Sequence, residues 1–252
     1  MEQELVVNGV KKSFGGLLAL QGVSLSVNKG SLTMLIGPNG SGKTTLINVI
    51  AGFYKPDEGS VLFEGRDITG WPPNKIYDAG LVRTFQIPSP FVKLSVLENL
   101  LTASPRNPGE SILKAPVRRL WVRKEREDVE RAFKVMELLE LDHLWDQPAN
   151  TLSGGQLKLL EVGRALMSGA KLILMDEPAS GINPALAHKV FSHIVDIKSK
   201  LGLTFLIVEH RLEIALRYVD YVYAMSQGKV ISHGSGEEVL KDPKVIEGYL
   251  GG

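Results

Sequence analysis

The sequence predicts an α/β protein in which helices cover a parallel sheet and a helical lobe is inserted. Three short apolar runs, at 32–36, 171–175 and 203–208, have the length and composition of buried strands. A helical pattern follows the first run at 44–50, and another separates the last two at 184–200. Strands that alternate with helices are typical of a parallel sheet covered on both faces.

Shorter strands are predicted near both ends of the chain. Val23, Leu25 and Val27 alternate with polar residues, which is the period of a half-buried strand. Residues 61–63 form an apolar segment between two glycines and predict another strand. Two further strands, at 221–225 and 230–232, flank a turn at residues 227–228.

The middle of the chain, from about residue 95 to 166, has a helical pattern. Apolar residues recur there at spacings of three and four, so they share one helix face: Val129, Ala132, Phe133, Met136 and Leu139. Residues 104–116 are richer in Pro, Gly, Ser and Asn and predict an irregular linker. We therefore expect this middle part to be a helical lobe inserted into the sheet.

Composition narrows the possible classes of protein. A formal net charge of +1 over 252 residues does not indicate a dedicated nucleic-acid binder. The absence of cysteine excludes disulfides and zinc-thiolate sites. No apolar run approaches the roughly 20 residues of a spanning helix, and the acidic N-terminus lacks an apolar signal region. We expect a soluble chain that would reach a membrane only through a partner.

A glycine-rich loop with the pattern G-x-x-x-x-G-K-[ST] follows the first apolar run. Its residues are Gly37, Pro38, Asn39, Gly40, Ser41, Gly42, Lys43, Thr44 and Thr45. Glycines let the backbone curl around an anion, and the N-terminus of the following helix favours negative charge. Lys43 can reach the outer phosphates of a nucleotide, and the Thr44 hydroxyl can bind Mg²⁺.

Two acids and a histidine follow the other two apolar runs. Asp176 and Glu177 end the run at 171–175, and His210 follows the run at 203–208. Because the carboxyl ends of parallel strands share one sheet edge, these groups should face the phosphate loop. Asp176 is suited to hold Mg²⁺, Glu177 to orient and deprotonate water, and His210 to contact a γ-phosphate. Solvated acids at a strand end and a structural histidine are the simpler alternatives.

A second helix start suited to an anion occurs at residues 151–156. Ser153 can cap a helix predicted at 157–167, and Gly154 and Gly155 allow close backbone approach to a ligand. An ordinary Ser-Gly cap is the simpler interpretation of this segment alone.

The full set of motifs resembles the ATPases of ABC transporters. The signature Leu-Ser-Gly-Gly-Gln is matched by residues 152–156, so that Ser153, Gly154, Gly155 and Gln156 would contact nucleotide. The order also matches: phosphate loop, glutamine loop, signature, acidic strand end and histidine. The resemblance covers essentially the whole chain. It implies that ATP and Mg²⁺ are bound between the phosphate loop of one subunit and the signature of another.

Three further assignments come from this resemblance. Gln86 matches the glutamine that reaches Mg²⁺ and links the core to the helical lobe. Phe14 matches an aromatic that stacks on adenine, although a core phenylalanine is the alternative. Asn183 departs from the family, which usually has Asp there, and this puts coupling between two sites through that residue in doubt.

The resemblance also implies a fold and its divisions. The expected fold is a P-loop NTPase core with a parallel sheet, an N-terminal antiparallel β subdomain and an inserted helical subdomain. The core would comprise residues 1–86 and 168–252, and the helical subdomain residues 87–167 with the signature.

Several short segments of the sequence are similar to the ATPases of the branched-chain amino-acid importer group, in particular to the larger of the two ATPase subunits. This similarity rests on residues 83–86, 177–184 and 208–210 and on an insertion at about 104–126. The basic run in that insertion is either a solvated helix face or a surface near the membrane partner or lipid. Apolar residues after Gln86 are candidates for contact with a membrane partner: Ile87, Phe91, Val92 and Leu94.

The expected partners are a second ATPase subunit, identical or different, integral membrane permease subunits and, indirectly, a solute-binding protein. No nucleic-acid partner is expected, and the expected location is the cytoplasmic face of the cell membrane. The alternatives are the ATPase of a lipid or lipopolysaccharide exporter and a soluble ABC ATPase outside transport.

Overall fold

The computed structural model describes residues 2–84, 89–105, 108–112 and 114–250. They divide into two compact units, each described here by itself: residues 1–86 with 171–252, and residues 87–170. Residues 168–170 group with the second unit, because Ser168 caps its last helix and the Ala170 amide donates to the Ala165 carbonyl.

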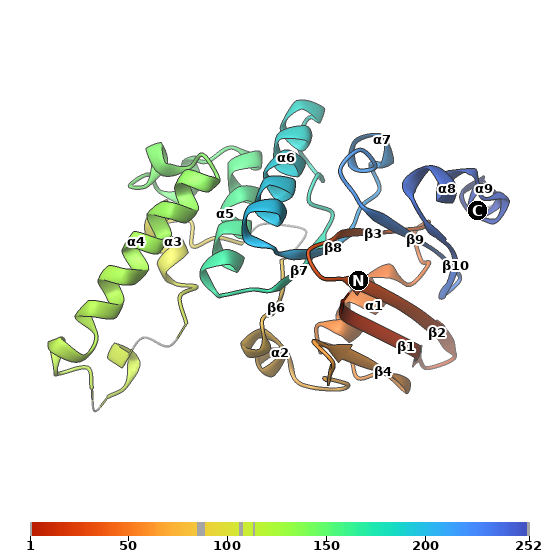
Figure 1. Ribbon diagram of the computed structural model, residues 1–252, viewed down its shortest axis with the longest axis horizontal. Helices are drawn as coiled ribbons and strands as arrows, with labels where there is room; N and C mark the ends of the chain where they lie inside the picture. The colour runs from red at the N-terminus through yellow and green to blue at the C-terminus, as the bar shows by residue number, and fades with distance from the viewer. Residues whose placement is uncertain (1, 85–88, 106–107, 113, 251–252) are drawn as a thin grey trace. The chain divides into compact units, whose positions relative to one another are not determined.

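The first unit contains two sheets (Figure 1). One is antiparallel, in the order β2-β1-β4-β5, with strands β1 (Gln3–Phe14), β2 (Leu17–Asn28), β4 (Glu58–Phe63) and β5 (Arg66–Asp67). The other has the order β10-β9-β3-β8-β7-β6. Its strands are β3 (Leu32–Ile36), β6 (Leu81–Arg83), β7 (Leu172–Asp176), β8 (Thr204–Val208), β9 (Tyr221–Ser226) and β10 (Lys229–Gly234). Only β10 runs antiparallel to its neighbour, so the expected parallel core sheet and antiparallel N-terminal sheet are confirmed.

Burial explains why the three apolar runs form the centre of the larger sheet. Every residue of β3, β7 and β8 is buried, as expected of parallel strands covered on both faces. Six helices accompany the sheets in the described part of this unit: α1 (Lys43–Ile50), α2 (Pro73–Ala79), α6 (Pro184–Leu201), α7 (Leu212–Ala215), α8 (Gly236–Lys241) and α9 (Pro243–Leu250). One core cluster contains side chains of both sheets and of α1, among them Val7, Leu46 and Leu206. This core fixes α1 and the loop before it against the sheet.

The second unit is helical. Its helices are α3 (Val96–Leu101), α4 (Val122–Leu138) and α5 (Gly154–Met167), with short 3-10 turns at Pro108–Glu110, Arg118–Leu120, Asp142–Leu144 and Ala149–Thr151. The predicted face of α4 is buried at Ala132 and Met136, and residue Leu139 just after it is buried too. In the described ranges, no helix has the length and apolar character that crossing a bilayer requires.

Candidate functional site

The predicted phosphate loop joins the end of β3 to the start of α1. Gly42 is the N-cap of α1, which begins at Lys43, and Thr44 and Thr45 lie in its first turn. The loop is pressed against β9: a Cβ atom at Gly37 would lie 2.3 Å from the Met225 carbonyl oxygen. Only glycine permits that approach, so the first glycine of the motif is required by packing as well as by ligand chemistry.

Lys43 is held inside its own loop. Its side chain donates to the carbonyl oxygens of Gly37, at 2.8 Å, and Pro38, at 2.9 Å. The residue is only 5% exposed. Burial lowers the pKa of Lys43, and the carboxylates of Glu177 and Asp176 oppose that change. A negatively charged ligand in the loop would further favour the charged ammonium.

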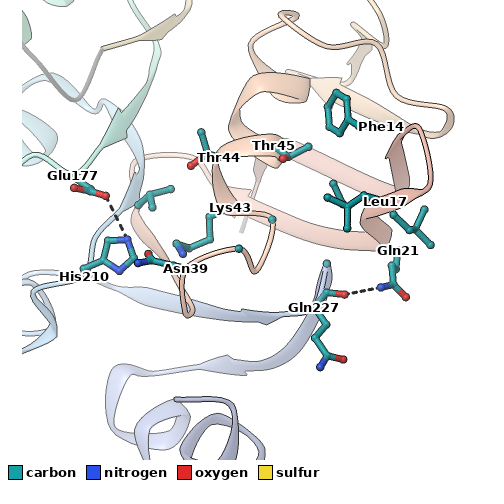
Figure 2. Close-up of a pocket in the computed structure, with 16 residues that line it drawn as sticks. Phe14, Leu17, Gln21, Asn39, Lys43, Thr44, Thr45, Glu177, His210 and Gln227 are labelled. Atoms are coloured by element: carbon teal, nitrogen blue, oxygen red, sulfur yellow. Dashed lines mark hydrogen bonds and ion pairs between the residues drawn. The ribbon is translucent and has the colours of Figure 1, made fainter. Parts of the chain in front are cut away.

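A cavity of about 680 Å³ opens in front of this loop. Figure 2 shows Lys43 and Asn39 on one side of it, with Glu177 and His210 beyond them. The β1–β2 hairpin, which includes Phe14, forms another wall of the cavity. The turn between β9 and β10 also lines the cavity. The lining residues are Phe14, Leu17, Leu18, Ala19, Gln21, Asn39, Gly40, Gly42, Lys43, Thr44, Thr45, Glu177, Val208, His210, Gln227 and Gly228. Pro38 and Ser41 lie in the same loop and line an adjoining cavity of about 480 Å³.

The strand ends bring Glu177 and His210 to this cavity, whereas Asp176 is not among the residues that line it. β8 lies between β3 and β7, so Glu177 and His210 follow neighbouring strands. The Nε2 atom of His210 is 3.4 Å from Oε1 of Glu177, and both side chains are partly exposed to the cavity. Glu177 has a positive φ of +50°, a conformation that non-glycine residues rarely adopt and that clusters at functional sites.

Asp176 is more deeply placed than Glu177. It is the last residue of β7, and its Oδ2 atom lies 3.4 Å from a guanidinium nitrogen of Arg83. Burial raises the pKa of Asp176, while the charge of Arg83 opposes the rise. The same guanidinium donates to the side chain of Asn48 in α1. Arg83 thus connects the acidic strand end to the helix that follows the phosphate loop.

Phe14 does not belong to the core. It is 42% exposed, lines the cavity, and meets the Tyr54 ring edge-on with ring centroids 5.1 Å apart. The alternative of a core phenylalanine is therefore wrong. Gln86, the predicted glutamine-loop residue, lies outside the described residues, as does Ile87.

The signature residues start helix α5 of the second unit. Ser153 is its N-cap, and the Ser153 hydroxyl accepts from the Gln156 amide while the Gln156 side chain accepts from the Ser153 amide. The helix begins at Gly154, three residues earlier than expected, because this reciprocal capping box holds Gly154 and Gly155 in the first turn. The amides of Gly154 and Gly155 also lie in this first turn, where a helix supplies no backbone carbonyl acceptor, and such a turn is suited to bind an anion.

Comparison with known proteins identifies the family. The family model described as ABC transporter matches residues 20–180. The chain belongs to the ABC transporter family. It is 55% identical to the probable branched-chain amino acid transport ATP-binding protein LivG of Archaeoglobus fulgidus, over 98% of this chain and 95% of that protein. It is 34% identical to the high-affinity branched-chain amino acid transport ATP-binding protein LivG of Escherichia coli K12, over 100% of this chain and 99% of that protein.

Solved structures agree with this assignment. A crystal structure of the ADP conformation of MJ1267, an ATP-binding cassette of an ABC transporter, matches with a TM-score of 0.87 and 52% identity over the whole of both chains. A nucleotide-free ATP-binding cassette from an ABC transporter matches with a TM-score of 0.84 and 53% identity over 98% of each chain. The chain is thus an ATP-binding cassette with the ATPase activity general to these transporter subunits.

Asn183, the departure from the family pattern, has a clear local role in this cassette. It is the N-cap of α6, and its side-chain oxygen accepts from the Leu186 amide at 2.9 Å. Asn and Asp are equally good N-caps, so the substitution leaves the start of the helix intact.

Several residues of the cassette's cavity escaped the sequence-based prediction. Leu17 and Leu18 form an exposed apolar surface beside Phe14, and Gln21 follows on the same strand. The Gln21 side chain donates to the Gln227 carbonyl oxygen at 2.8 Å (Figure 2). Gly15 and Gly16 form the turn between β1 and β2, but nothing in the local pattern showed that this hairpin tip faces the phosphate loop.

Proposed function

We propose that this cassette is the ATP-hydrolysing subunit of an ABC importer for branched-chain amino acids. The cavity that carries the phosphate loop, Glu177 and His210 together is the observation on which this proposal depends. The amino-acid specificity is supported by the names of relatives that match along nearly the whole chain.

ATP would occupy the main cavity. Lys43 and the loop amides would contact the phosphates, and the Phe14 ring would stack on the adenine. Thr44 and Asp176 supply oxygen donors, the ligand type that Mg²⁺ prefers, and Gln86 would join them. Among the residues that the structure describes, no group of three or more His, Cys, Asp or Glu side chains forms a metal cage. Mg²⁺, when bound by these oxygen donors, would neutralise negative charge on the phosphates.

Glu177 and His210 would carry the hydrolytic step. Glu177 would accept a proton from the attacking water. The oxygen of that water forms a bond to the γ-phosphorus, and the bond between the γ-phosphorus and the leaving oxygen of ADP breaks. His210, whose Nε2 atom lies 3.4 Å from Oε1 of Glu177, would donate a hydrogen bond toward the γ-phosphate.

We infer that the active form is a dimer, of identical or different ATPase subunits. The signature turn is a second helix start suited to an anion, and the family resemblance implies that it contacts a nucleotide bound to the phosphate loop of another subunit. A permease would anchor the pair at the cytoplasmic face of the membrane and receive substrate from a solute-binding protein. Phe91 and Val92, exposed apolar residues of the helical unit, are candidates for the permease contact.

The test uses the full cassette co-purified with its membrane partners in lipid vesicles. Glu177→Gln should retain ATP binding and lower the hydrolysis rate at least about 100-fold, because it removes the base that activates water. Leucine uptake should stop in the same variant. Glu237→Gln, at an exposed glutamate of α8, is the matched control and should leave both rates unchanged.

Three outcomes would contradict the proposal. Normal hydrolysis by Glu177→Gln would refute the role of that residue. Export of lipid or lipopolysaccharide by the complex would refute import as the task. A cassette that co-purifies with no membrane protein would favour a soluble ABC ATPase.

A further inference from the structure

Glu209 is a buried carboxylate that the hydrolytic scheme does not use. It is 1% exposed and lies between Val208, the last residue of β8, and His210. Its Oε2 atom accepts from the Ala179 amide at 3.0 Å, and its Oε1 atom accepts from the amides of His210, at 2.9 Å, and Arg211, at 3.1 Å. Three backbone donors on one carboxylate make a rigid junction between segments thirty residues apart in sequence.

Arg211 contacts the same loop, the one that contains Ala179, by donating hydrogen bonds to its backbone carbonyl groups. Its Nη1 atom donates to the carbonyl oxygens of Ile182, at 2.8 Å, and Ala179, at 3.4 Å. Ala179 is therefore held through both its amide and its carbonyl by the two residues that flank His210. The Arg211 side chain also lies 3.6 Å from the carboxylate of Glu213, which helps to orient the guanidinium.

This junction fixes the backbone around Glu177 and His210, which together are called the hydrolytic pair. Glu177 lies two residues before Ala179, and its amide donates to the Val208 carbonyl at 2.8 Å. The Ser180 amide donates to the Glu177 carbonyl at 3.0 Å, so the turn after Glu177 is fixed at both ends. The positive φ of Glu177 needs such support, because a strained conformation persists only where its surroundings determine it.

We propose that Glu209 and Arg211 are positioning residues that set the distance between Glu177 and His210. The proposal rests on the proposed hydrolytic role of that pair. Both residues act on the backbone that presents the pair, and neither lines the main cavity, so they should affect the chemical step more than nucleotide binding.

The carboxylate of Glu209 is matched to its three donors. A glutamine side chain has the same shape as glutamate but carries one oxygen and one NH₂ group in place of the two oxygens. In Glu209→Gln, the NH₂ group would therefore face a backbone amide that needs an acceptor. Glu209→Gln should therefore loosen the junction without opening a void in the core. Arg211→Lys keeps the charge but loses the guanidinium, whose Nη1 atom donates to both carbonyls.

The experiment measures ATP hydrolysis, ATP affinity and thermal unfolding in the complete complex. Glu209→Gln and Arg211→Lys should each lower kcat about tenfold or more, with KM and the ATP dissociation constant within about threefold of wild type. The double variant should lose little more than either single variant, because both act through one loop. Glu237→Gln again serves as the matched control and should leave kcat unchanged.

Unchanged kcat in both single variants would overturn the proposal. A parallel loss of kcat, ATP affinity and thermal stability would also overturn it, because that pattern reports general damage to the fold. A wild-type complex that hydrolyses no ATP would instead refute the proposed function, and the two failures are therefore distinguishable.

Discussion

Two hairpin turns with almost the same geometry give a sharp test of how the phosphate loop is held. The β9–β10 turn has Gln227 at φ +49° and Gly228 at φ +74°. The β4–β5 turn has Glu64 at φ +49° and Gly65 at φ +73°. Both are two-residue turns whose positive φ angles favour glycine in the second position.

Their surroundings differ. A Cβ atom at Gly65 would meet nothing within 4 Å, whereas one at Gly228 would lie 2.7 Å from the Ala19 carbonyl oxygen. Gly228 also donates to the Ser41 carbonyl of the phosphate loop at 3.0 Å and accepts from the Gln21 amide at 2.8 Å. The β9–β10 turn therefore connects the phosphate loop to the strand that carries the apolar wall of the cavity.

Alanine at either glycine should cost about 1 to 2 kcal/mol for the left-handed backbone. At Gly228 the clash adds about 1 to 3 kcal/mol, as overpacking does in cores. Loss of one of its two backbone hydrogen bonds adds about 1 kcal/mol more. We therefore expect Gly228→Ala to destabilise the protein by about 2 to 4 kcal/mol more than Gly65→Ala.

Urea unfolding of the two variants measures this difference, and ATP titration measures its consequence. Gly228→Ala should also weaken ATP binding, because Ser41 moves with the turn, while Gly65→Ala should leave the affinity at the wild-type value. Equal destabilisation by the two substitutions would refute the reasoning, because the close approach of Gly228 to Ala19 would then make no difference to the free energy of unfolding.

Two other predictions concern charged groups. Lys43→Ala should weaken ATP binding by about 2 to 3 kcal/mol, which isothermal titration measures and an unchanged affinity would contradict. Burial raises the pKa of Glu161 from 4.5 to about 6, although Lys158 and Arg164 oppose the rise. Because the folded-state pKa is the higher one, up to about 2 kcal/mol of stability is present below pH 4.5 and is lost as the pH rises through 6. Glu161→Gln should flatten that part of the stability-pH curve, and an unaltered curve would show that another group titrates there.

The sequence predicted the elements whose local pattern and tertiary role agree. β3, β7 and β8 are continuous apolar runs because both of their faces are buried, so composition alone indicated them. The phosphate loop was predictable because ligand chemistry dictates its residues. By contrast, α5 begins at two glycines, which disfavour helix by intrinsic propensity, and the capping box of Ser153 and Gln156 decides its start. β6 has only three residues, too few to show any period.

Long-range contacts account for the rest of what the sequence did not show. Glu209 contacts Ala179 only because β7 and β8 are neighbours, and no local pattern distinguishes it from a solvated acid after a strand. The same holds for Leu17 and Leu18, whose exposure beside Phe14 depends on where the hairpin tip lies.

Lys43 shows why a sequence motif that correctly predicts a binding residue does not give the free energy which that residue adds to binding. Its ammonium already donates to two loop carbonyls, so a bound phosphate must compete with partners that are part of the same loop. The free energy that Lys43 adds to binding is the difference between charge-assisted bonds to phosphate and bonds to those carbonyls. That difference is smaller than the full strength of either set, which is why we expect a loss of a few kcal/mol for Lys43→Ala. We therefore expect Lys43 to strengthen phosphate binding and, through its bonds to Gly37 and Pro38, to stabilise the curled loop before any phosphate arrives.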